Sequence, residues 1–377
     1  MRILRVAQKL YPDVTGGGPY HVHAMSRDQA AMGHDVTVLT VGPHSEETRD
    51  GYRVVRRPAS ASPLGNELST GVGRFLVDAV SSGQYDVVHA HSHLYFSTNL
   101  AALATRFSDV PLAVTNHGLY SQTAPKVVFD AYLRTLGRWT FNRASVAFCY
   151  TEADRDRLRG IGVTAPIEVV HNGIDTTRFT PDGPVSERLP TGDGPVILFV
   201  GRLVEGKRPR DAVAAVDQLR ADMPDAHLVV CGDGPLQEGL EDLVAARGMG
   251  EAVTFLGHVA YDEMPAVYRG ADALILPSRA EGLPRTVLEA LASGVPAVVS
   301  DLEHVAPLVD DVGETVTVGN ISGYSTSIKQ VLVETPSSPR SAIEGHYNWD
   351  STVELTTSHL YRVVEEAEGR CSDKDQG

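Results

Sequence analysis

Short apolar runs rich in valine, isoleucine and leucine recur along the sequence and alternate with stretches of helix length. Runs such as Ile3–Ala7, Leu112–Thr115 and Val196–Val200 are almost continuously hydrophobic. A strand that is apolar on both faces is typical of a parallel sheet covered by helices on both sides. The pattern therefore predicts parallel strands joined by helices. The other runs that we expect to form strands are Val36–Thr40, Tyr52–Arg56, Val87–Ala90, Val146–Tyr150, Ile167–Val170, Leu228–Cys231, Val253–Leu256, Ala273–Leu276 and Ala297–Ser300.

The runs fall into two series, which indicates two domains. A single hydrophobic core rarely grows past about 250–300 residues, and the chain has 377. A polar stretch rich in proline and glycine, Pro181–Pro195, separates the two series. Its composition is typical of a linker or an exposed loop. We predict an α/β protein with two doubly wound domains that face each other across a cleft. In such sheets, ligands bind beyond the carboxyl ends of the strands.

Composition excludes several classes of protein. The 33 basic and 48 acidic residues leave a formal net charge of −15, which repels nucleic acid. No apolar run approaches the roughly 20 residues that span a bilayer. The amino terminus leads directly into a strand-like segment without the pattern of a signal peptide. Cys149 and Cys231 lie in apolar runs, so we expect inert core thiols in a reducing compartment. These features predict a cytoplasmic protein.

A glycine-rich turn follows the first expected strand. Gly16, Gly17 and Gly18 precede a helix that we expect to end at about Gly33. Three glycines allow the backbone to approach a ligand closely, and a helix N-terminus offers free amides and a positive dipole end. This predicts an anion site suited to a diphosphate; a tight turn without a ligand is the alternative. The turn is not a dinucleotide fingerprint, because the G-x-G-x-x-G spacing is absent.

A pair of cations follows the first strand of the second series. Arg202 and Lys207 come directly after Val196–Val200. The segment Gly201–Lys207 superficially matches a P-loop, but Arg208 replaces the hydroxyl residue that would bind magnesium, so we reject NTP hydrolysis. Two cations at the carboxyl end of a strand can clamp a pair of phosphates without metal. Two solvated surface cations are the alternative.

Two glutamates eight positions apart form the most specific motif. Glu281 is predicted to lie in a loop, and Glu289 in a helix that Pro284 is well placed to begin. Carboxylates in these places suit bidentate hydrogen bonding to sugar diols. A solvated helix face is the alternative, but the intervening Gly-Leu-Pro favours a binding site. The backbone amides that suit a phosphate are those of Leu283, Arg285 and Thr286.

Taken in order, these motifs resemble the retaining GT-B glycosyltransferases of family 4, which are nucleotide-sugar-dependent hexosyltransferases. The resemblance covers essentially the whole chain. It rests on the segments Gly16–Gly18, Gly33–Val38, Asp86–His91, Thr115–Gly118, Asn172–Asp175, Gly201–Arg202, Cys231–Pro235, the Glu281/Glu289 pair and Trp349–Tyr361.

The resemblance implies a GT-B fold of two Rossmann-like domains. Residues 1–172 would form the N-terminal, acceptor-side domain, and residues 173–349 the C-terminal domain that binds the nucleotide sugar. A terminal helix over about 350–368 would return to the N-terminal domain. The implied reaction moves a hexose from a nucleotide diphosphate sugar to an acceptor hydroxyl with retention, and it needs no metal and no cofactor besides the sugar donor. The acceptor would be a glycolipid, a polyprenyl-linked glycan or a small molecule.

The resemblance also implies roles for single residues. Arg202 and Lys207 would hold the diphosphate, Glu289 the ribose hydroxyls and Glu281 the transferred sugar. The residues implied as catalytic are His117, which would face the reacting centre, Arg202, Lys207 and Glu281. The implied donor-binding residues are Gly16, Gly17, Arg202, Lys207, Glu281, Gly282, Leu283, Arg285, Thr286 and Glu289. Pro284 stands where many relatives have an amide donor, and the stretch after Asp301 is shorter than the usual glycine-rich loop of the family. Both departures concern donor specificity.

Two further patterns resemble metal motifs and are interpreted as structural. His89, His91 and His93 alternate along an expected strand end and would point to one side. Asp154 and Asp156 form a D-x-D at a charged helix start, where positions two apart do not converge. We expect a solvated helix face there and no metal site in the chain.

One segment is basic within an acidic chain. Residues 126–143 carry four basic side chains against Asp130 alone, interleaved with aliphatic and aromatic residues. The segment is predicted to be a helix that covers the N-terminal sheet. The alternative is a helix that faces a membrane surface or a polyprenyl diphosphate, which would place the protein peripherally at the inner membrane face.

Two rival functions share the predicted architecture. A sugar-nucleotide epimerase or hydrolase would keep the fold and change the reaction. A non-catalytic sugar-binding protein would also close two doubly wound domains on a sugar. The absence of a signal peptide pattern and the cation pair at the phosphate position argue against the second alternative.

Overall fold

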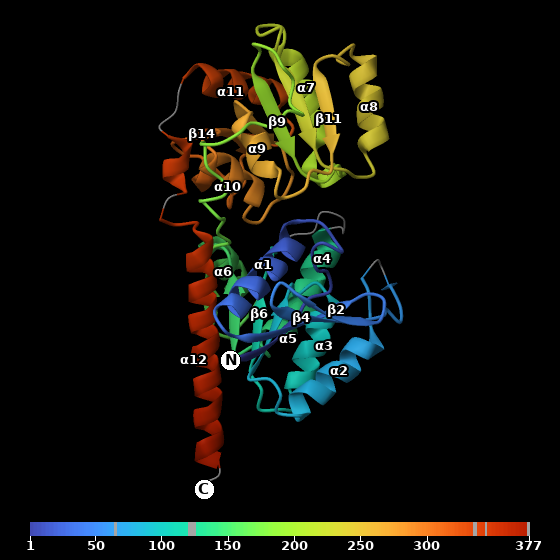
Figure 1. Cartoon of the computed structure of the whole chain (residues 1–377), viewed down its shortest axis with the longest axis vertical. Helices are drawn as coiled ribbons and strands as arrows, with labels where there is room; N and C mark the ends of the chain where they lie inside the picture. Colours follow the sequence, from blue (N-terminus) through green and yellow to red (C-terminus); the bar gives the residue numbers. More distant parts are fainter. Residues whose placement is uncertain (64–65, 120–125, 335–337, 344, 375–377) are drawn as a thin grey trace. The chain divides into compact units, whose positions relative to one another are not determined.

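The computed structural model describes residues 1–63, 66–119, 126–334, 338–343 and 345–374. They form two compact units (Figure 1). The first unit contains the described residues of 1–171 and 351–377, and the second contains those of 172–350. Each unit is built on one sheet with helices packed against it, which confirms the predicted α/β class with two Rossmann-like domains. None of the described helices is long and apolar enough to cross a membrane.

The sheet of the first unit has eight strands in the order β3-β4-β2-β1-β5-β6-β7-β8. Neighbouring strands are parallel except β3 and β4, which are antiparallel. The strands are β1 Arg2–Val6, β2 Asp35–Val41, β3 Ser45–Arg49, β4 Tyr52–Arg57, β5 Val87–His91, β6 Leu112–Thr115, β7 Val146–Cys149 and β8 Ile167–Val169.

Helices cover both faces of this sheet, because successive strand side chains point to opposite sides. Leu4 packs with side chains from α2 to α6, whereas the adjacent Ile3 packs in a second cluster with α1 and α12. The helical segments are α1 Gly17–Ala31, α2 Thr70–Ser81, α3 Phe96–Thr105, α4 Lys126–Tyr132, the π-helix η2 Leu133–Gly137, α5 Arg138–Phe141, α6 Glu152–Gly160 and α12 Trp349–Lys374.

The sheet of the second unit has six strands in the order β11-β10-β9-β12-β13-β14, all parallel. Its strands are β9 Val196–Val200, β10 His227–Cys231, β11 Val253–Gly257, β12 Ala273–Leu276, β13 Ala297–Ser300 and β14 Gly313–Val316. Helices α7, α8 and α11 pack with Ile197 and Phe199 of β9 on one face. The helical segments are η3 Glu205–Lys207, α7 Pro209–Leu219, α8 Gln237–Ala246, α9 Met264–Arg269, α10 Arg285–Ala292, η4 Ala306–Leu308, α11 Ile321–Val333 and η5 Pro339–Ala342.

All of the expected strands are present, and two further strands were not predicted from the sequence. Strand β3 is polar throughout, and strand β14 begins with glycine and carries one buried residue. Both lie at sheet edges, where a strand has a single neighbour and needs fewer apolar side chains. Ion pairs with β4 stabilise β3, including Glu47 with Arg56 at 3.0 Å.

The prediction that three alternating histidines point to one side is wrong for the third. Strand β5 ends at His91, and Ser92 has a φ of 66°, so the alternation stops there. His93 is fully buried and packs instead against the rings of Tyr132 and Phe141.

The prediction of a solvated D-x-D is wrong for its first member. Asp156 is exposed, but Asp154 is 1% exposed. The side chain of Thr151 caps α6 by accepting a hydrogen bond from the Asp154 amide at 3.1 Å. Two residues apart on a helix, the two aspartates point in different directions, and one of them faces inward.

The prediction that the two cysteines in apolar runs are buried thiols is confirmed. Cys149 and Cys231 are buried and form no disulfide. Burial raises the pKa of each thiol to about 12, so both remain protonated at neutral pH and are poor nucleophiles.

The terminal helix α12, red in Figure 1, packs on the first unit, as predicted. Leu360 and Val363 enter the cluster around Ile3, and Gln29 donates a hydrogen bond from its side-chain amide to the Thr357 hydroxyl at 2.8 Å. The helix continues to Lys374, beyond the range of about 350–368 that we expected for it; residues 375–377 lie outside the described residues.

Replacing Leu360 by alanine should lower the free energy of unfolding of the first unit by about 2–5 kcal/mol, because it leaves a cavity in the core. Leu355 is the matched control: it lies on the same helix and is 50% exposed, so Leu355→Ala should change stability by about 0.5 kcal/mol or less. Urea unfolding followed by circular dichroism measures both. Equal effects of the two variants would contradict the packing of α12 described here.

Candidate active site

The strand order of the second sheet brings together the loops that carry the predicted site. Strand β9 pairs with β10 on one side and with β12 on the other. The chain adds β10 and β11 on one side of β9 and then continues with β12 on the other, so the strand order reverses at β9. Ligands of doubly wound sheets bind at such a switch point, beyond the carboxyl ends of the strands. Arg202 and Lys207 follow β9, and Glu281 follows β12. Two motifs that are far apart in the sequence therefore meet at this point.

Lys207 and Glu281 form an ion pair. The Lys207 Nζ lies 2.5 Å from Glu281 Oε1, and the two side chains are 14% and 5% exposed. A buried carboxylate without a partner is costly, so each charge makes the other tolerable. An ammonium has three N–H donors, so the pairing leaves Lys207 capacity to bind a phosphate oxygen. The alternative of two solvated surface cations does not describe Lys207.

A glycine-containing loop after β10 supports the Arg202 segment. A Cβ atom on Gly232 would lie 2.0 Å from the carbonyl oxygen of Gly201, and Gly232 has a φ of 138°. The Leu203 amide donates to the Asp233 carbonyl at 2.7 Å, and the Gly201 amide donates to the Cys231 carbonyl at 2.9 Å. The backbone on both sides of Arg202 is thus held by this loop. The sequence marked Cys231–Pro235 as a motif but did not reveal this supporting role.

Glu289 is a buried residue of α10. The helix begins at Arg285, with Pro284 as its N-cap. The Tyr268 hydroxyl donates to Glu289 Oε2 at 3.0 Å, and Arg285 Nε lies 3.6 Å from Glu289 Oε1. Burial raises the pKa of Glu289, and the Arg285 charge opposes this increase. A solvated helix face is therefore excluded for this glutamate.

The remaining predicted donor-binding residues surround the start of α10. Gly282 and Leu283 are buried and Thr286 is half-buried. The Thr286 Oγ1 atom is inaccessible to solvent and has no hydrogen-bond partner among the described residues. The Arg285 guanidinium is directed to other parts of the second unit, so the contact predicted for this residue would come from its main-chain amide.

In the first unit, the glycine turn and His117 are neighbours. Gly16 is the N-cap of α1 with a φ of 133°, and a Cβ atom on Gly18 would lie 3.9 Å from His117 Nδ1. The turn follows β1 and His117 follows β6, and β5 lies between these two strands. These predicted residues therefore lie at the carboxyl end of the first sheet.

His117 belongs to a cluster that sequence reasoning missed. Its Nε2 lies 3.0 Å from His91 Nδ1, and its Nδ1 lies 2.8 Å from the Tyr150 hydroxyl. The ring of His21 packs edge-on against it, with the centroids 5.2 Å apart. Both nitrogens of His117 thus have protein partners, which hold the ring in one orientation. His91 lies in a motif quoted above, whereas no local pattern pointed to His21 or Tyr150.

Burial keeps His89, His91, His93 and His117 neutral. It lowers the pKa of His117 to about 4 and that of His93 to about 3, and it lowers the pKa of His89 and His91 well below the usual value. The buried Arg5 guanidinium lowers the pKa of His89 and His91 further. Within the described ranges, no group of three or more histidine, cysteine or acidic side chains could hold a metal ion.

Two family profiles match the chain in succession. The profile "Glycosyltransferase Family 4" matches residues 15–178, and "Glycosyl transferases group 1" matches residues 186–349. Together they span most of the chain, and each falls largely within one of the two units.

The chain is a GT-B glycosyltransferase of family 4.

Similar proteins match most or nearly all of the length of this glycosyltransferase. "Glycogen synthase" of Mycobacterium tuberculosis is 29% identical over 98% of this chain and 96% of its own length. "GDP-mannose-dependent alpha-(1-6)-phosphatidylinositol monomannoside mannosyltransferase" of Mycolicibacterium smegmatis is 28% identical over 80% of this chain and 81% of its own. Sucrose-phosphate synthase from Thermosynechococcus elongatus has the same fold, with a TM-score of 0.79, 19% identity and coverage of 97% and 99%.

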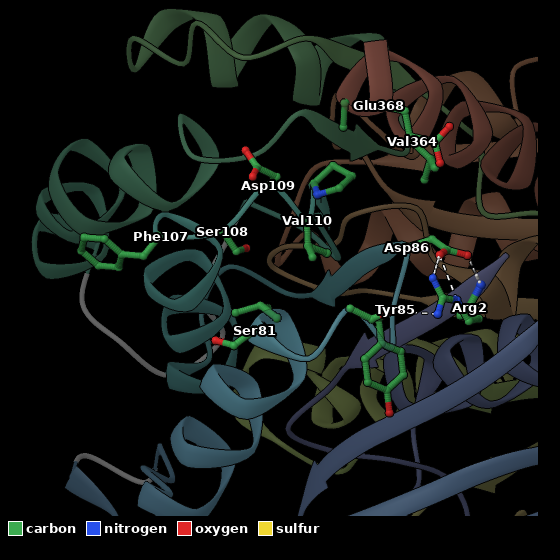
Figure 2. A pocket seen from close by; sticks show the side chains of 14 residues that line it. Arg2, Ser81, Tyr85, Asp86, Phe107, Ser108, Asp109, Val110, Val364 and Glu368 are labelled. Carbon is green, nitrogen blue, oxygen red and sulfur yellow. Dashed lines mark hydrogen bonds and ion pairs between the residues drawn. The ribbon is translucent and has the colours of Figure 1, made fainter. Parts of the chain in front are cut away.

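A hollow elsewhere on the first unit of the glycosyltransferase is not part of this site (Figure 2). Its volume is about 780 Å³, and it is bordered by Arg2, by Asp86 and by Val364 and Glu368 of α12. Arg2 begins β1 and Asp86 precedes β5, so the hollow lies at the amino ends of these strands. None of the predicted site residues lines it.

Acidification should destabilise the first unit, because its buried histidines are neutral when folded and bind protons when unfolded. Burial lowers the pKa of His117 from 6.5 to about 4. The unfolded state therefore binds a proton at His117 before the folded state does, and the free energy of unfolding decreases as pH falls from 6.5 to 4. We expect His117→Gln to reduce the loss of unfolding free energy between pH 7 and pH 5 by about 2 kcal/mol.

The measurement is urea unfolding at the two pH values. His44→Gln, at an exposed position of the same unit, is the control and should leave the loss unchanged. A pH dependence that is the same in both variants would show that His117 is not held neutral by burial.

Proposed function

We propose that this glycosyltransferase moves a hexose from a nucleotide diphosphate sugar to an acceptor hydroxyl, with retention and without a metal. The observation that carries the proposal is the meeting of Lys207 and Glu281 at the switch point between β9 and β12. A cation for the diphosphate and a carboxylate for the sugar are the two groups that such a donor requires side by side. Glu289, on the helix that follows the same loop, is the proposed partner of the ribose hydroxyls.

Names of similar proteins support a nucleotide-sugar donor. The M. smegmatis relative is named as GDP-mannose-dependent. Anabaena Alr3699/HepE, of which a crystal structure contains UDP-glucose, has a TM-score of 0.78 at 18% identity and coverage of 96% and 100%. The bases and sugars differ between these proteins, so we propose the class of donor and leave the base to experiment.

In the proposed reaction, the protein stabilises the charge that develops on the leaving diphosphate. Arg202, Lys207 and the amides of Leu283, Arg285 and Thr286 would act together there. Such fixed charges and dipoles favour the transition state because they need little reorganisation when the glycosidic bond breaks. They would also replace a divalent cation, so turnover should be insensitive to EDTA.

We propose attack of the acceptor on the face that the diphosphate leaves. The bond from the anomeric carbon to the phosphate oxygen breaks, the bond to the acceptor oxygen forms, and a phosphate oxygen takes the acceptor proton. Glu281 is paired with Lys207, which suits it to orient a sugar hydroxyl better than to act as a nucleophile. Product NMR would show the same anomeric configuration as in the donor; an inverted product would contradict this route.

A lipid-linked acceptor is the class that we propose to test first. In the basic segment, Phe129, Leu133 and Phe141 are buried in the core of the first unit, so the segment does cover the sheet. Its other side exposes Val127 (81%) and Val128 (59%), together with the side chains of Ala131, Arg134, Leu136 and Arg138. Apolar and basic side chains on one exposed face favour contact with an anionic membrane. Sedimentation with phosphatidylglycerol vesicles, but not with phosphatidylcholine vesicles, is the expected result.

The donor base can be found by thermal shift with UDP-, GDP- and ADP-sugars. A sugar donor at 100 times its dissociation constant adds about 2.7 kcal/mol of stability. Analysis of products with and without acceptor then separates transfer from the rival reactions, since an epimerase or hydrolase would consume the donor without any acceptor.

Arg202→Ala and Lys207→Ala should each slow transfer by about 100-fold or more, because each removes a charge that stabilises the leaving diphosphate. Lys329→Ala is the matched control: this exposed lysine pairs with Asp222 on the surface and should retain full turnover. Lys207→Ala leaves the buried Glu281 carboxylate without its partner, so the Lys207→Ala/Glu281→Gln double variant is measured beside it. Near-normal turnover by the folded variants would refute these roles.

A further inference from the structure

Arg285 occupies the first position of α10, and its side chain is 9% exposed. Its Nη1 donates to the Gly173 carbonyl at 3.0 Å and to Asn172 Oδ1 at 3.3 Å, and its Nη2 lies 3.0 Å from the Tyr261 hydroxyl. Its Nε lies 3.6 Å from Glu289 Oε1, one helical turn along α10. One guanidinium thus contacts three separate parts of the second unit.

The two segments next to the Arg285 guanidinium are joined to each other by backbone hydrogen bonds. The Ile174 amide donates to the Tyr347 carbonyl at 2.8 Å, and the Trp349 amide donates to the Ile174 carbonyl at 2.9 Å. The Arg285 guanidinium lies over the Trp349 ring, 5.8 Å from its centroid. Arg285 is therefore anchored to two paired segments of the second unit, which gives its position little freedom.

Glu289 is the group on which Arg285 acts. The charged and titratable groups that face this buried carboxylate are Arg285 of α10, Tyr268 of α9, Tyr261 and Arg178. Arg178 is itself paired with Asp262. Burial favours the neutral acid, which would turn one acceptor oxygen into a donor and weaken hydrogen bonds from a sugar diol. The guanidinium charge of Arg285 opposes this protonation.

We propose that Arg285 is a positioning residue that keeps Glu289 an oriented carboxylate for the ribose hydroxyls, and that it thereby sets the affinity for the sugar donor. This inference rests on the proposed function, in which Glu289 binds the ribose. It assigns the Arg285 side chain a role separate from the main-chain amide considered above. The side chain of Arg285 acts on donor binding and not on the chemical step.

The geometry requires arginine at this position. A planar guanidinium can serve several acceptors at fixed angles while its face lies over an aromatic ring. A lysine ammonium is a single charge and cannot reach Gly173, Tyr261 and Glu289 together. Arg285→Lys should therefore retain part of the effect on the charge of Glu289 and lose the orientation.

The test measures transfer kinetics and binding of the nucleoside diphosphate that stabilises the wild-type protein, between pH 5.5 and pH 8. For Arg285→Met we expect a donor KM at least 10-fold higher with kcat within about threefold of wild type. Binding should weaken further as pH falls, because Glu289 then takes up a proton, and it should recover as pH rises. Arg285→Lys should lie between Arg285→Met and wild type.

Two variants separate this role from a merely structural one. Glu289→Gln should weaken binding without the added pH dependence, and Arg285→Met/Glu289→Gln should bind no worse than Glu289→Gln. Arg269→Met is the matched control, because Arg269 donates to the Pro184 carbonyl and is not among the groups that face Glu289. It should keep the wild-type affinity and pH profile.

The outcomes distinguish the two proposals. Unchanged affinity and pH profile in Arg285→Met, or a loss confined to kcat, would overturn the role of Arg285 while Glu289→Gln still weakens binding. If Arg285→Met does not fold, a wild-type affinity and pH profile in Arg285→Lys would overturn it equally. If Glu289→Gln binds as well as wild type, the assignment of the ribose to Glu289 fails, and the proposed function must be revised.

Discussion

The site depends on a buried ion pair between two loops of one sheet. Lys207 follows β9 and Glu281 follows β12, and their charged ends meet at 2.5 Å with little exposure to solvent. Each charge offsets the cost of burying the other, so the pair joins the two loops. It also holds a cation and a carboxylate next to each other, and fixed charge of this kind is what transfer of a sugar from a diphosphate requires.

The first unit has buried polar side chains that are uncharged. Its site residues are histidines that burial keeps neutral, linked through His91, His117 and Tyr150. Neutral imidazoles supply hydrogen-bonding groups without the desolvation cost of a charge. The candidate site residues of the two units therefore differ in chemistry: they are fixed charges in the second unit, and oriented neutral groups beside a glycine turn in the first.

Much of the fold was predictable, because a strand in the middle of a parallel sheet must be apolar on both faces. Every interior strand was found from its apolar residues, although β4 also carries three arginines. Strands β3 and β14 lie at sheet edges and were not predicted. The errors at His93 and Asp154 have a related cause. Sequence spacing gives the direction of a side chain only while the element continues, and it does not show which neighbours cover that side chain.

The sequence by itself determined the alternation of strands and helices, the glycine turns and the identities of the charged residues, because these follow from local periodicity and backbone freedom. Only the tertiary structure decided which of these residues contact one another. Lys207 meets Glu281 because β9 lies beside β12, and Arg285 meets Gly173 because the second unit folds these segments together. Pairing between residues so distant in the chain is set by strand order and packing, which no local pattern encodes.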